Sequence, residues 1–193
     1  MRKFCWRWGW LYAVLATSCG KQAELPEFGQ APAFIGINQD GNLFAPQHLR
    51  GQVWVAGFIF TRCPTICPRV TAEMSRWARD TAGDSPPPAL VSISVDPEHD
   101  GPAQMKAFGE RFGADFRRWH FVTGNSTALR RAVVEGFKIA VDSSRASGNP
   151  EQLLHGTHLV LVDRRGTIRG YYPSNESAAL EQLRKDARAL SAR

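Results

Sequence analysis

Long apolar runs separated by stretches with helical spacing dominate the middle of the chain. Residues 53–60 (VWVAGFIF) and 89–95 (ALVSISV) have the length and character of strands buried on both faces. Between them, Val70, Met74 and Trp77 recur at helical spacing. A strand, a helix and a second buried strand in this order predict a parallel pair joined by a crossover.

The remaining pattern adds further helices and antiparallel hairpins. A hairpin is predicted at 33–44 around Asp40-Gly41, where the Asp-Gly pair favours a tight turn. After the second buried strand, the pattern predicts a helix at 101–113, a strand at 119–124, a helix at 126–137 capped by Ser126, a hairpin at 157–172 and a helix at 178–190. Parallel strands combined with a hairpin make a mixed central sheet flanked by helices. The predicted fold class is therefore α/β, with a thioredoxin-like plan.

The first residues follow a different pattern from the body of the chain. Arg2, Lys3 and Arg7 accompany a mostly apolar stretch of about ten residues from Trp8 to Thr17. A bilayer-spanning helix needs about 20 apolar residues, so this stretch is too short to span as a mature helix. Residues 1–18 are therefore predicted to be a secretory signal peptide.

The end of this leader, "LATSC", resembles the lipobox of bacterial lipoproteins, in which the cysteine is acylated after cleavage. Ala16 occupies the place where leucine is usual, so the match is incomplete. We expect lipidation of Cys19, with simple secretion or an uncleaved anchor as the alternatives. Residues 19–31 are polar with Pro and Gly, which is typical of a tether, and residues 32–193 are long enough for one domain.

The net charge of +6 changes little in this interpretation. Three of the cations lie in the leader, where no acidic residue accompanies them, so the mature body is only mildly basic. Beyond the leader, Lys and Arg form no extended cluster interleaved with aromatic residues, which argues against a nucleic-acid partner.

Two cysteines, Cys63 and Cys67, remain in the mature body and lie directly behind the strand at 53–60. The helix that follows begins near Cys67, and the positive end of a helix favours thiolate over thiol. A disulfide between these residues would close a very small loop and restrain the unfolded chain little. A purely structural disulfide is therefore a poor explanation for the pair.

Two chemistries remain open for these thiols. Thiolates select soft ions such as Cu(I), zinc or iron–sulfur centres, but a single cysteine pair is unlike the four-ligand sites of structural zinc. The second chemistry is a redox couple, although three residues separate Cys63 and Cys67, whereas redox thioredoxin-like proteins usually have two between their cysteines.

An imidazole would be a natural third ligand for copper. The five histidines are His48, His99, His120, His155 and His158. The last two stand out because they lie at the entrance to the hairpin at 157–172. His158 falls inside the strand pattern, whereas His155 precedes it.

The motifs "FIFTRCPTICP", "VSISVDPEHDGP", "RFGAD" and "LVDRRGTIRGYY" resemble those of the Sco/SenC family, over about Pro32 to Tyr172. The resemblance implies a thioredoxin-like fold and copper ligation by Cys63, Cys67 and His155. Gly156 departs from the Ser or Thr that commonly follows the family histidine, which keeps His158 as an alternative to His155. Asp96 matches the aspartate of the family's "VDP" motif, with either turn capping or tuning of the metal site as its role.

The function implied by this resemblance is that of a copper chaperone. It would carry Cu(I) or Cu(II) to the dinuclear copper site of cytochrome c oxidase subunit II, with another copper chaperone as a possible second partner. A lipid anchor would hold it at a membrane of the bacterial cell envelope, facing the periplasm or exterior. The alternative is a thiol–disulfide reductase that keeps the oxidase cysteines reduced for metal loading, in which case the protein would have enzymatic activity.

Overall fold

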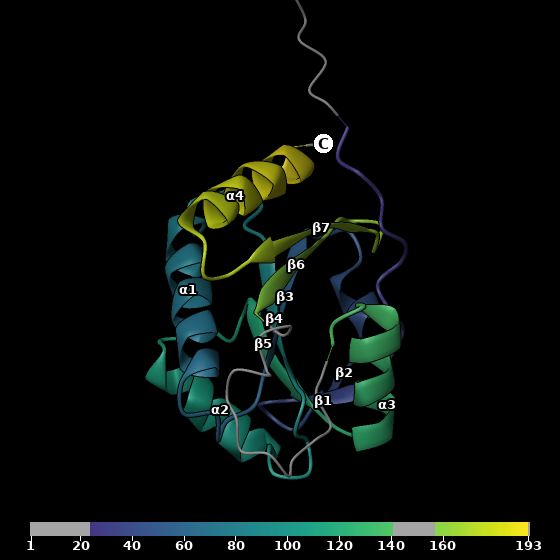
Figure 1. The fold of residues 1–193 in the computed structure, drawn as a ribbon, viewed down its shortest axis with the longest axis vertical. Coiled ribbons are helices and arrows are strands. Elements are labelled where there is room, and N and C mark those ends of the chain that lie inside the picture. Colours follow the sequence, from purple (N-terminus) through teal and green to yellow (C-terminus); the bar gives the residue numbers. More distant parts are fainter. Residues whose placement is uncertain (1–23, 141–156, 193) are drawn as a thin grey trace, which may run out of the picture.

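The computed structural model describes residues 24–140 and 157–192 of the chain, and a seven-stranded mixed sheet forms their centre (Figure 1). Its strand order is β2-β1-β5-β4-β3-β6-β7. The strands are β1 (Gly36–Asn38), β2 (Leu43–Phe44), β3 (Trp54–Ile59), β4 (Ala89–Ser94), β5 (Trp119–Thr123), β6 (His158–Val162) and β7 (Ile168–Pro173). Strands β3, β4 and β5 are parallel, and the outer strands join them in antiparallel pairs.

Helices cover both faces of this sheet (Figure 1). They are α1 (Ile66–Asp80), α2 (Pro102–Arg111), α3 (Ser126–Arg131) and α4 (Ser177–Ser191). A 3-10 turn spans Pro46–Leu49, and a π-helical turn at Ala132–Gly136 continues α3. Helices α1, α2 and α4 pack on one face, while α3 and its continuation pack on the other. The predicted α/β class with a mixed, helix-flanked sheet is confirmed.

The central strands are apolar throughout because successive side chains enter two different cores. Leu159 and Leu161 of β6 join the cluster under α1, α2 and α4. Val160 and Val162 join the cluster under α3. This alternation follows from the two-residue period of a strand, and it explains why these strands read as continuous apolar runs.

The helix patterns are confirmed, with one correction at a helix end. Helix α3 is capped by Asn125, not by Ser126: the Asn125 side-chain oxygen accepts a hydrogen bond of 2.9 Å from the Ala128 backbone N–H. Both residue types favour this position, and the extended backbone at Asn125 decides between them.

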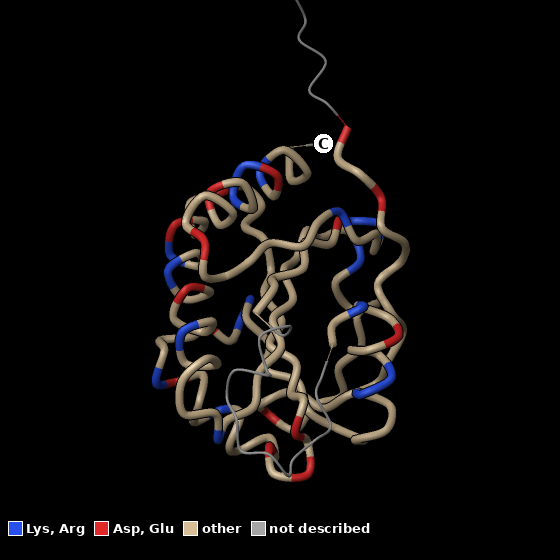
Figure 2. Tube along the Cα trace, viewed as in Figure 1, with Lys and Arg blue, Asp and Glu red and all other residues tan. Residues whose placement is uncertain are grey.

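Helix α4 shows the expected division between an apolar and a charged side. Leu183, Ala187 and Leu190 are buried in the core, and Leu180 packs partly buried beside them. Charged positions of both signs alternate along the outer side of this helix (Figure 2). Within the described residues, no helix is long and apolar enough to cross a membrane. The predicted signal peptide and Cys19 lie outside the described residues.

The segment from Leu25 to Ala31, within the predicted tether, is bound to the β6–β7 hairpin. The Phe28 N–H donates to the Ile168 carbonyl over 2.9 Å, and the Ile168 N–H donates to the Gly29 carbonyl over 2.8 Å. The Ala31 N–H donates to the Gly166 carbonyl over 2.8 Å. We call residues 25–31 the N-terminal arm; its backbone hydrogen bonds make it part of the folded body.

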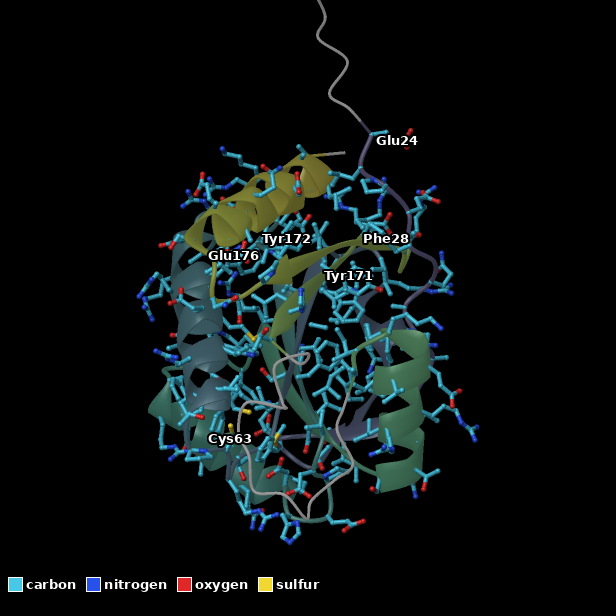
Figure 3. The ribbon with its side chains drawn as sticks, in the orientation of Figure 1. Glu24, Phe28, Cys63, Tyr171, Tyr172 and Glu176 are labelled. Atoms are coloured by element: carbon cyan, nitrogen blue, oxygen red, sulfur yellow. The ribbon has the colours of Figure 1, made fainter. Side chains whose placement is uncertain are left out.

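A buried ion pair holds the arm and the hairpin together. Arg169, only 2% exposed, lies 3.0 Å from the Asp163 carboxylate through Nη1. The same guanidinium donates to the Pro26 carbonyl over 3.0 Å and also to the Leu25 carbonyl. Asp163 accepts two further hydrogen bonds, of 2.9 Å each, from the backbone of the hairpin turn. Glu24, at the start of this arm, and Cys63 lie toward opposite ends of the molecule (Figure 3).

Breaking this pair is expected to destabilise the protein strongly. Arg169→Met would leave the Asp163 carboxylate buried without its buried guanidinium partner, with only the exposed Arg165 guanidinium 3.7 Å away, and we expect a loss of about 3 kcal/mol in the free energy of unfolding. Urea denaturation measures the change. The control is Arg117→Met, because the Arg117 side chain is 90% exposed and its ion pair with Asp115 lies in solvent. Equal stability losses in the two variants would contradict this account.

Candidate metal centre

Both body cysteines lie where β3 passes into α1, at the carboxyl end of a central parallel strand. Strand β3 ends at Ile59 and α1 begins at Ile66, so Cys63 is in the connecting loop and Cys67 is in the first helical turn. Pro68 follows within the same turn, where a missing N–H costs no intrahelical hydrogen bond. The predicted position of Cys67 at the helix N-terminus is confirmed, and ligand sites in α/β sheets gather at such strand ends.

The two sulfur atoms are close together and almost inaccessible. Cys63 is 6% exposed and Cys67 is 5% exposed, and both are free thiols in this structure. The Cys67 backbone N–H donates to the Cys63 Sγ over 3.3 Å. The Phe60 backbone N–H donates to the Cys67 Sγ over 3.4 Å. Each sulfur therefore receives a backbone donor, which favours negative charge at this point.

A hydrogen bond between the two thiols makes them unequal acids. It lowers the pKa of Cys63 to about 5, against the opposing effect of burial and with help from backbone N–H groups of the first helical turn. The same hydrogen bond raises the pKa of Cys67, and burial and the negative charge of Asp100 raise it further. The pair thus favours negative charge on Cys63 and retention of the proton on Cys67.

Asp96 lies beside this loop and pairs with a residue next to Cys63. Its carboxylate accepts a hydrogen bond of 2.7 Å from Arg62 and lies 3.1 Å from the His99 ring nitrogen Nδ1. Burial alone would raise the pKa of Asp96, but the hydrogen bonds from Arg62 and His99 lower it. The side chain therefore links the loop after β4 to the loop carrying Cys63.

Three of the five histidines are engaged elsewhere. His99 interacts with Asp96, while His48 and His120 flank Phe44, with ring-centroid distances of 6.1 and 5.3 Å. Phe44 belongs to the cluster under α3, whereas both cysteines belong to the cluster under α1. Among residues 24–140 and 157–192, no group of three or more His, Cys, Asp or Glu side chains is arranged to hold a metal ion.

The remaining two histidines belong to the entrance of the β6–β7 hairpin. His158 is the first residue of β6 and has the same strand parity as Val160 and Val162, which face the cluster under α3. Its side chain therefore starts toward the face opposite to the cysteines. His155, the other predicted ligand, lies outside the described residues.

The family model described as SCO1/SenC matches residues 22–190, which is most of the chain. The chain belongs to the SCO1/SenC family. Among curated relatives, the SCO1 protein homolog of Bacillus subtilis is 30% identical over 184 residues, covering 95% of this chain and 94% of its own. A protein of Stutzerimonas stutzeri, named as a candidate copper-binding protein, is 30% identical over 148 residues, covering 76% of this chain and 71% of its own.

Solved structures of Sco proteins have the same fold as this chain. A SCO1/SenC family lipoprotein from Bacillus anthracis is 31% identical, with a TM-score of 0.75 over 84% of this chain and 95% of its own. BsSco, described as a member of the Sco family of cytochrome c oxidase assembly proteins with a disulfide switch, is 29% identical. Its TM-score is 0.78 over 89% of this chain and 99% of its own. The expected family and thioredoxin-like fold are confirmed.

Two residues at this Sco site were not predicted from sequence. Thr61 precedes Cys63 by two residues, and Asp100 follows Asp96 by four in the "DPEHD" stretch. In the structure, Asp100 accepts a hydrogen bond of 2.6 Å from the Thr61 hydroxyl. A sequence shows that these residues are polar but carries no signal that the carboxyl is buried, so their contact required the tertiary structure.

The unequal thiols predict a distinctive pH profile for alkylation by iodoacetamide. The rate at Cys63 should rise with its thiolate fraction through about pH 5 and then level off, whereas an ordinary thiol with a pKa of 9.0 gains reactivity only near that pH. Peptide mass spectrometry at each pH assigns the modified cysteine.

The Cys67→Ala variant tests the cause of this profile. It removes the thiol hydrogen bond that is the largest cause of the lowered pKa, so the Cys63 midpoint should move to higher pH. An unchanged midpoint in Cys67→Ala, or a wild-type midpoint near 9, would contradict the assignment of Cys63 as the thiolate.

Proposed function

We propose that this Sco protein binds one copper ion through Cys63, Cys67 and His155 and delivers it to the dinuclear copper site of cytochrome c oxidase. The observation that carries the proposal is the convergence of two thiols, one in the loop before α1 and one in its first turn, with Cys63 already favoured as a thiolate. Thiolate and imidazole together suit copper, which accepts fewer ligands than structural zinc. The relatives named for copper binding and for oxidase assembly support the same assignment.

The strand register favours His155 over His158 as the third ligand. Ala56 of β3 pairs with Val160 of β6, and the strands are antiparallel, so the chain before β6 heads toward the loop that follows β3. His158 starts toward the α3 face, opposite to the thiols. Strand β6 begins at the sheet end that carries the cysteines, and three peptide units, at most about 11 Å of extended chain, separate the Cα atoms of His158 and His155.

Delivery by ligand exchange fits the state of the two thiols. Cys63 is the thiolate to which copper would bind first, and Cys67 must release its proton before it becomes the second ligand. Copper binding therefore releases a proton, and rising acidity weakens the binding of copper by this protein. The site lies at a loop at the end of the sheet, where an incoming partner can approach.

A thiol–disulfide reductase is the second candidate function, and the lowered pKa of Cys63 is the observation that favours it. The Cys63 thiolate would attack a disulfide of the substrate and form a mixed disulfide. Cys67 would then lose its proton and attack Cys63, which leaves a Cys63–Cys67 disulfide and two thiols on the substrate. The disulfide switch described for BsSco is consistent with this chemistry.

Substitution of the ligands separates these functions. Cys63→Ser and Cys67→Ser should each abolish stoichiometric copper binding by the reduced protein, measured by titration with absorption and mass spectrometry. His155→Ala should weaken copper binding at least tenfold and change the absorption spectrum. His158→Ala is the matched control and should leave both unchanged. Normal copper affinity in the double cysteine variant would reject the copper proposal.

The same variants test the reductase candidate. A reductase does not need an imidazole ligand, so His155→Ala should keep the wild-type rate of reducing a model disulfide peptide. Loss of copper binding without loss of this turnover identifies two separable activities. Failure of the wild-type protein to reduce the peptide would exclude the reductase function.

We also propose that residues 1–18 are removed and that lipid on Cys19 holds the domain at a membrane of the bacterial envelope. The Bacillus anthracis relative is described as a lipoprotein, which supports this. Because the N-terminal arm is bound to the body, the tether consists only of the residues between Cys19 and Leu25. An extended chain of that length spans about 20 Å. Cys63 lies toward the opposite end of the molecule from Glu24, so the thiols would face away from the membrane (Figure 3).

Energy transfer tests this orientation on the acylated protein in liposomes that carry an acceptor lipid. A donor fluorophore is attached to a click-reactive residue in place of either Glu27, in the arm, or His99, beside the cysteine loop. Both side chains are about half exposed. Transfer should be stronger from position 27. Equal transfer, or stronger transfer from position 99, would contradict the orientation.

A further inference from the structure

A fully buried carboxyl group lies beneath the cysteine loop. Asp100 has 0% exposure, and both of its oxygen atoms accept hydrogen bonds. Oδ1 accepts from the Thr61 hydroxyl over 2.6 Å and from the Thr61 N–H over 3.1 Å. Oδ2 accepts from the Ser94 hydroxyl over 2.6 Å. Burying such a group is costly unless its hydrogen bonds are all made, so Asp100 strongly favours the arrangement of the donors around it.

These donors belong to the two segments that leave the sheet at this edge. Ser94 is the last residue of β4, and Thr61 follows the end of β3. Asp100 itself precedes α2, and its backbone N–H donates to the Asp96 carbonyl over 3.0 Å. One carboxyl group therefore ties together the ends of two parallel strands and the start of the next helix.

The restraint that Asp100 imposes on Thr61 also affects both sulfur atoms. Thr61 follows Phe60, whose N–H donates to the Cys67 Sγ over 3.4 Å. The Phe60 carbonyl accepts from the Cys63 N–H over 3.2 Å. Restraining Thr61 therefore restrains the backbone donor to one sulfur and the turn that carries the other.

The start of α1 provides no equivalent restraint. Its N-cap residue, Thr65, makes no capping hydrogen bond with its side chain. A Ser or Thr side chain at this position commonly bonds a backbone N–H of the first turn. The carboxylates that hold the loop between β3 and α1 therefore act on its first residues, Asp100 on Thr61 and Asp96 on Arg62, whereas its end is held by the hydrogen bond from the Cys67 N–H to the Cys63 sulfur.

We propose that Asp100 is a positioning residue for the thiol pair: by accepting both Thr61 donors, it holds Cys63 and Cys67 at the separation that copper binding or disulfide formation requires. The copper part of this inference rests on the proposed function. The positioning of the thiols does not, because disulfide formation measures it without metal.

Thr61→Val tests the positioning with a small change. Valine has nearly the shape of threonine and keeps the backbone N–H, so the variant loses only the hydroxyl donor to Asp100. Thr61→Ser restores a hydroxyl and should rescue the wild-type behaviour. Tyr172→Phe is the matched control, because it removes a hydroxyl that donates to another buried carboxylate, Asp186, over 2.7 Å.

Two equilibrium constants are measured on the full chain, and its unfolding in urea is measured in parallel. One is the affinity of the reduced protein for Cu(I), by competition with a chromophoric chelator. The other is the equilibrium constant for the reaction with oxidised glutathione, which yields the Cys63–Cys67 disulfide and two molecules of reduced glutathione. Thr61→Val should lower both constants about tenfold. Thr61→Ser and Tyr172→Phe should stay within twofold of the wild type.

The outcomes decide between positioning and a purely structural role. If Thr61→Val loses as much stability as Tyr172→Phe but keeps both constants within twofold of the wild type, Asp100 only stabilises the fold and the inference is overturned. Asp100→Asn, which changes the acceptor itself, must show the same pattern as Thr61→Val. If the wild-type protein binds no copper, the proposed function fails. The glutathione equilibrium alone then tests the positioning role of Asp100.

Discussion

Strand β3 is the constraint on which the site depends. It is paired on both edges, in parallel with β4 and antiparallel with β6, and it is buried on both faces. At Gly57, an added Cβ atom would lie 2.6 Å from the Met74 sulfur, so helix α1 packs directly against the strand. The strand cannot shift without disturbing the sheet and both cores. The loop that leaves its carboxyl end therefore begins from a rigid position, and this position determines where the cysteines lie.

The chemistry of the pair follows from this rigidity. Two nearly inaccessible thiols held within hydrogen-bonding distance share one proton, which favours thiolate at Cys63 and thiol at Cys67. That state is suited both to capturing a soft metal ion and to attacking a disulfide. The two proposed functions, copper delivery and thiol exchange, would therefore use the same pair of thiols, and they differ in whether they need a third ligand.

The β6–β7 hairpin connects the two ends of the molecule. Strand β6 starts with His158 at the edge that carries the cysteine loop, and it ends before Asp163, which pairs with Arg169 and thereby holds the N-terminal arm. The guanidinium of Arg169 is buried together with its carboxylate, so loss of either partner would leave a charge in the interior with only a weaker, exposed partner: Arg165 for Asp163 or Glu27 for Arg169. The arm is thus as firmly attached as the hairpin itself, and it fixes where the chain leaves the domain.

Much of the fold could be predicted from the sequence because local patterns specify it. Apolar runs identified β3 and β4, helical spacing identified α1, α2 and α4, and an Asp-Gly pair identified the first hairpin. The cysteines were predicted to form the site from their types, spacing and place behind a strand, and the structure shows that their sulfur atoms lie close together. These features act within a few residues of one another, so they are visible in a linear sequence.

Contacts between distant segments decided the rest. Asn125 and Ser126 are both good caps, and only the backbone conformation selects Asn125. His155 and His158 are equivalent by residue type, but strand parity turns His158 toward the α3 face. Asp100 looks like a solvated turn residue until the fold places it under Thr61. The amino-acid sequence by itself determined the strands, helices and reactive residues; the tertiary structure decided which polar groups are buried and which of them meet, because burial depends on what the rest of the chain packs against them.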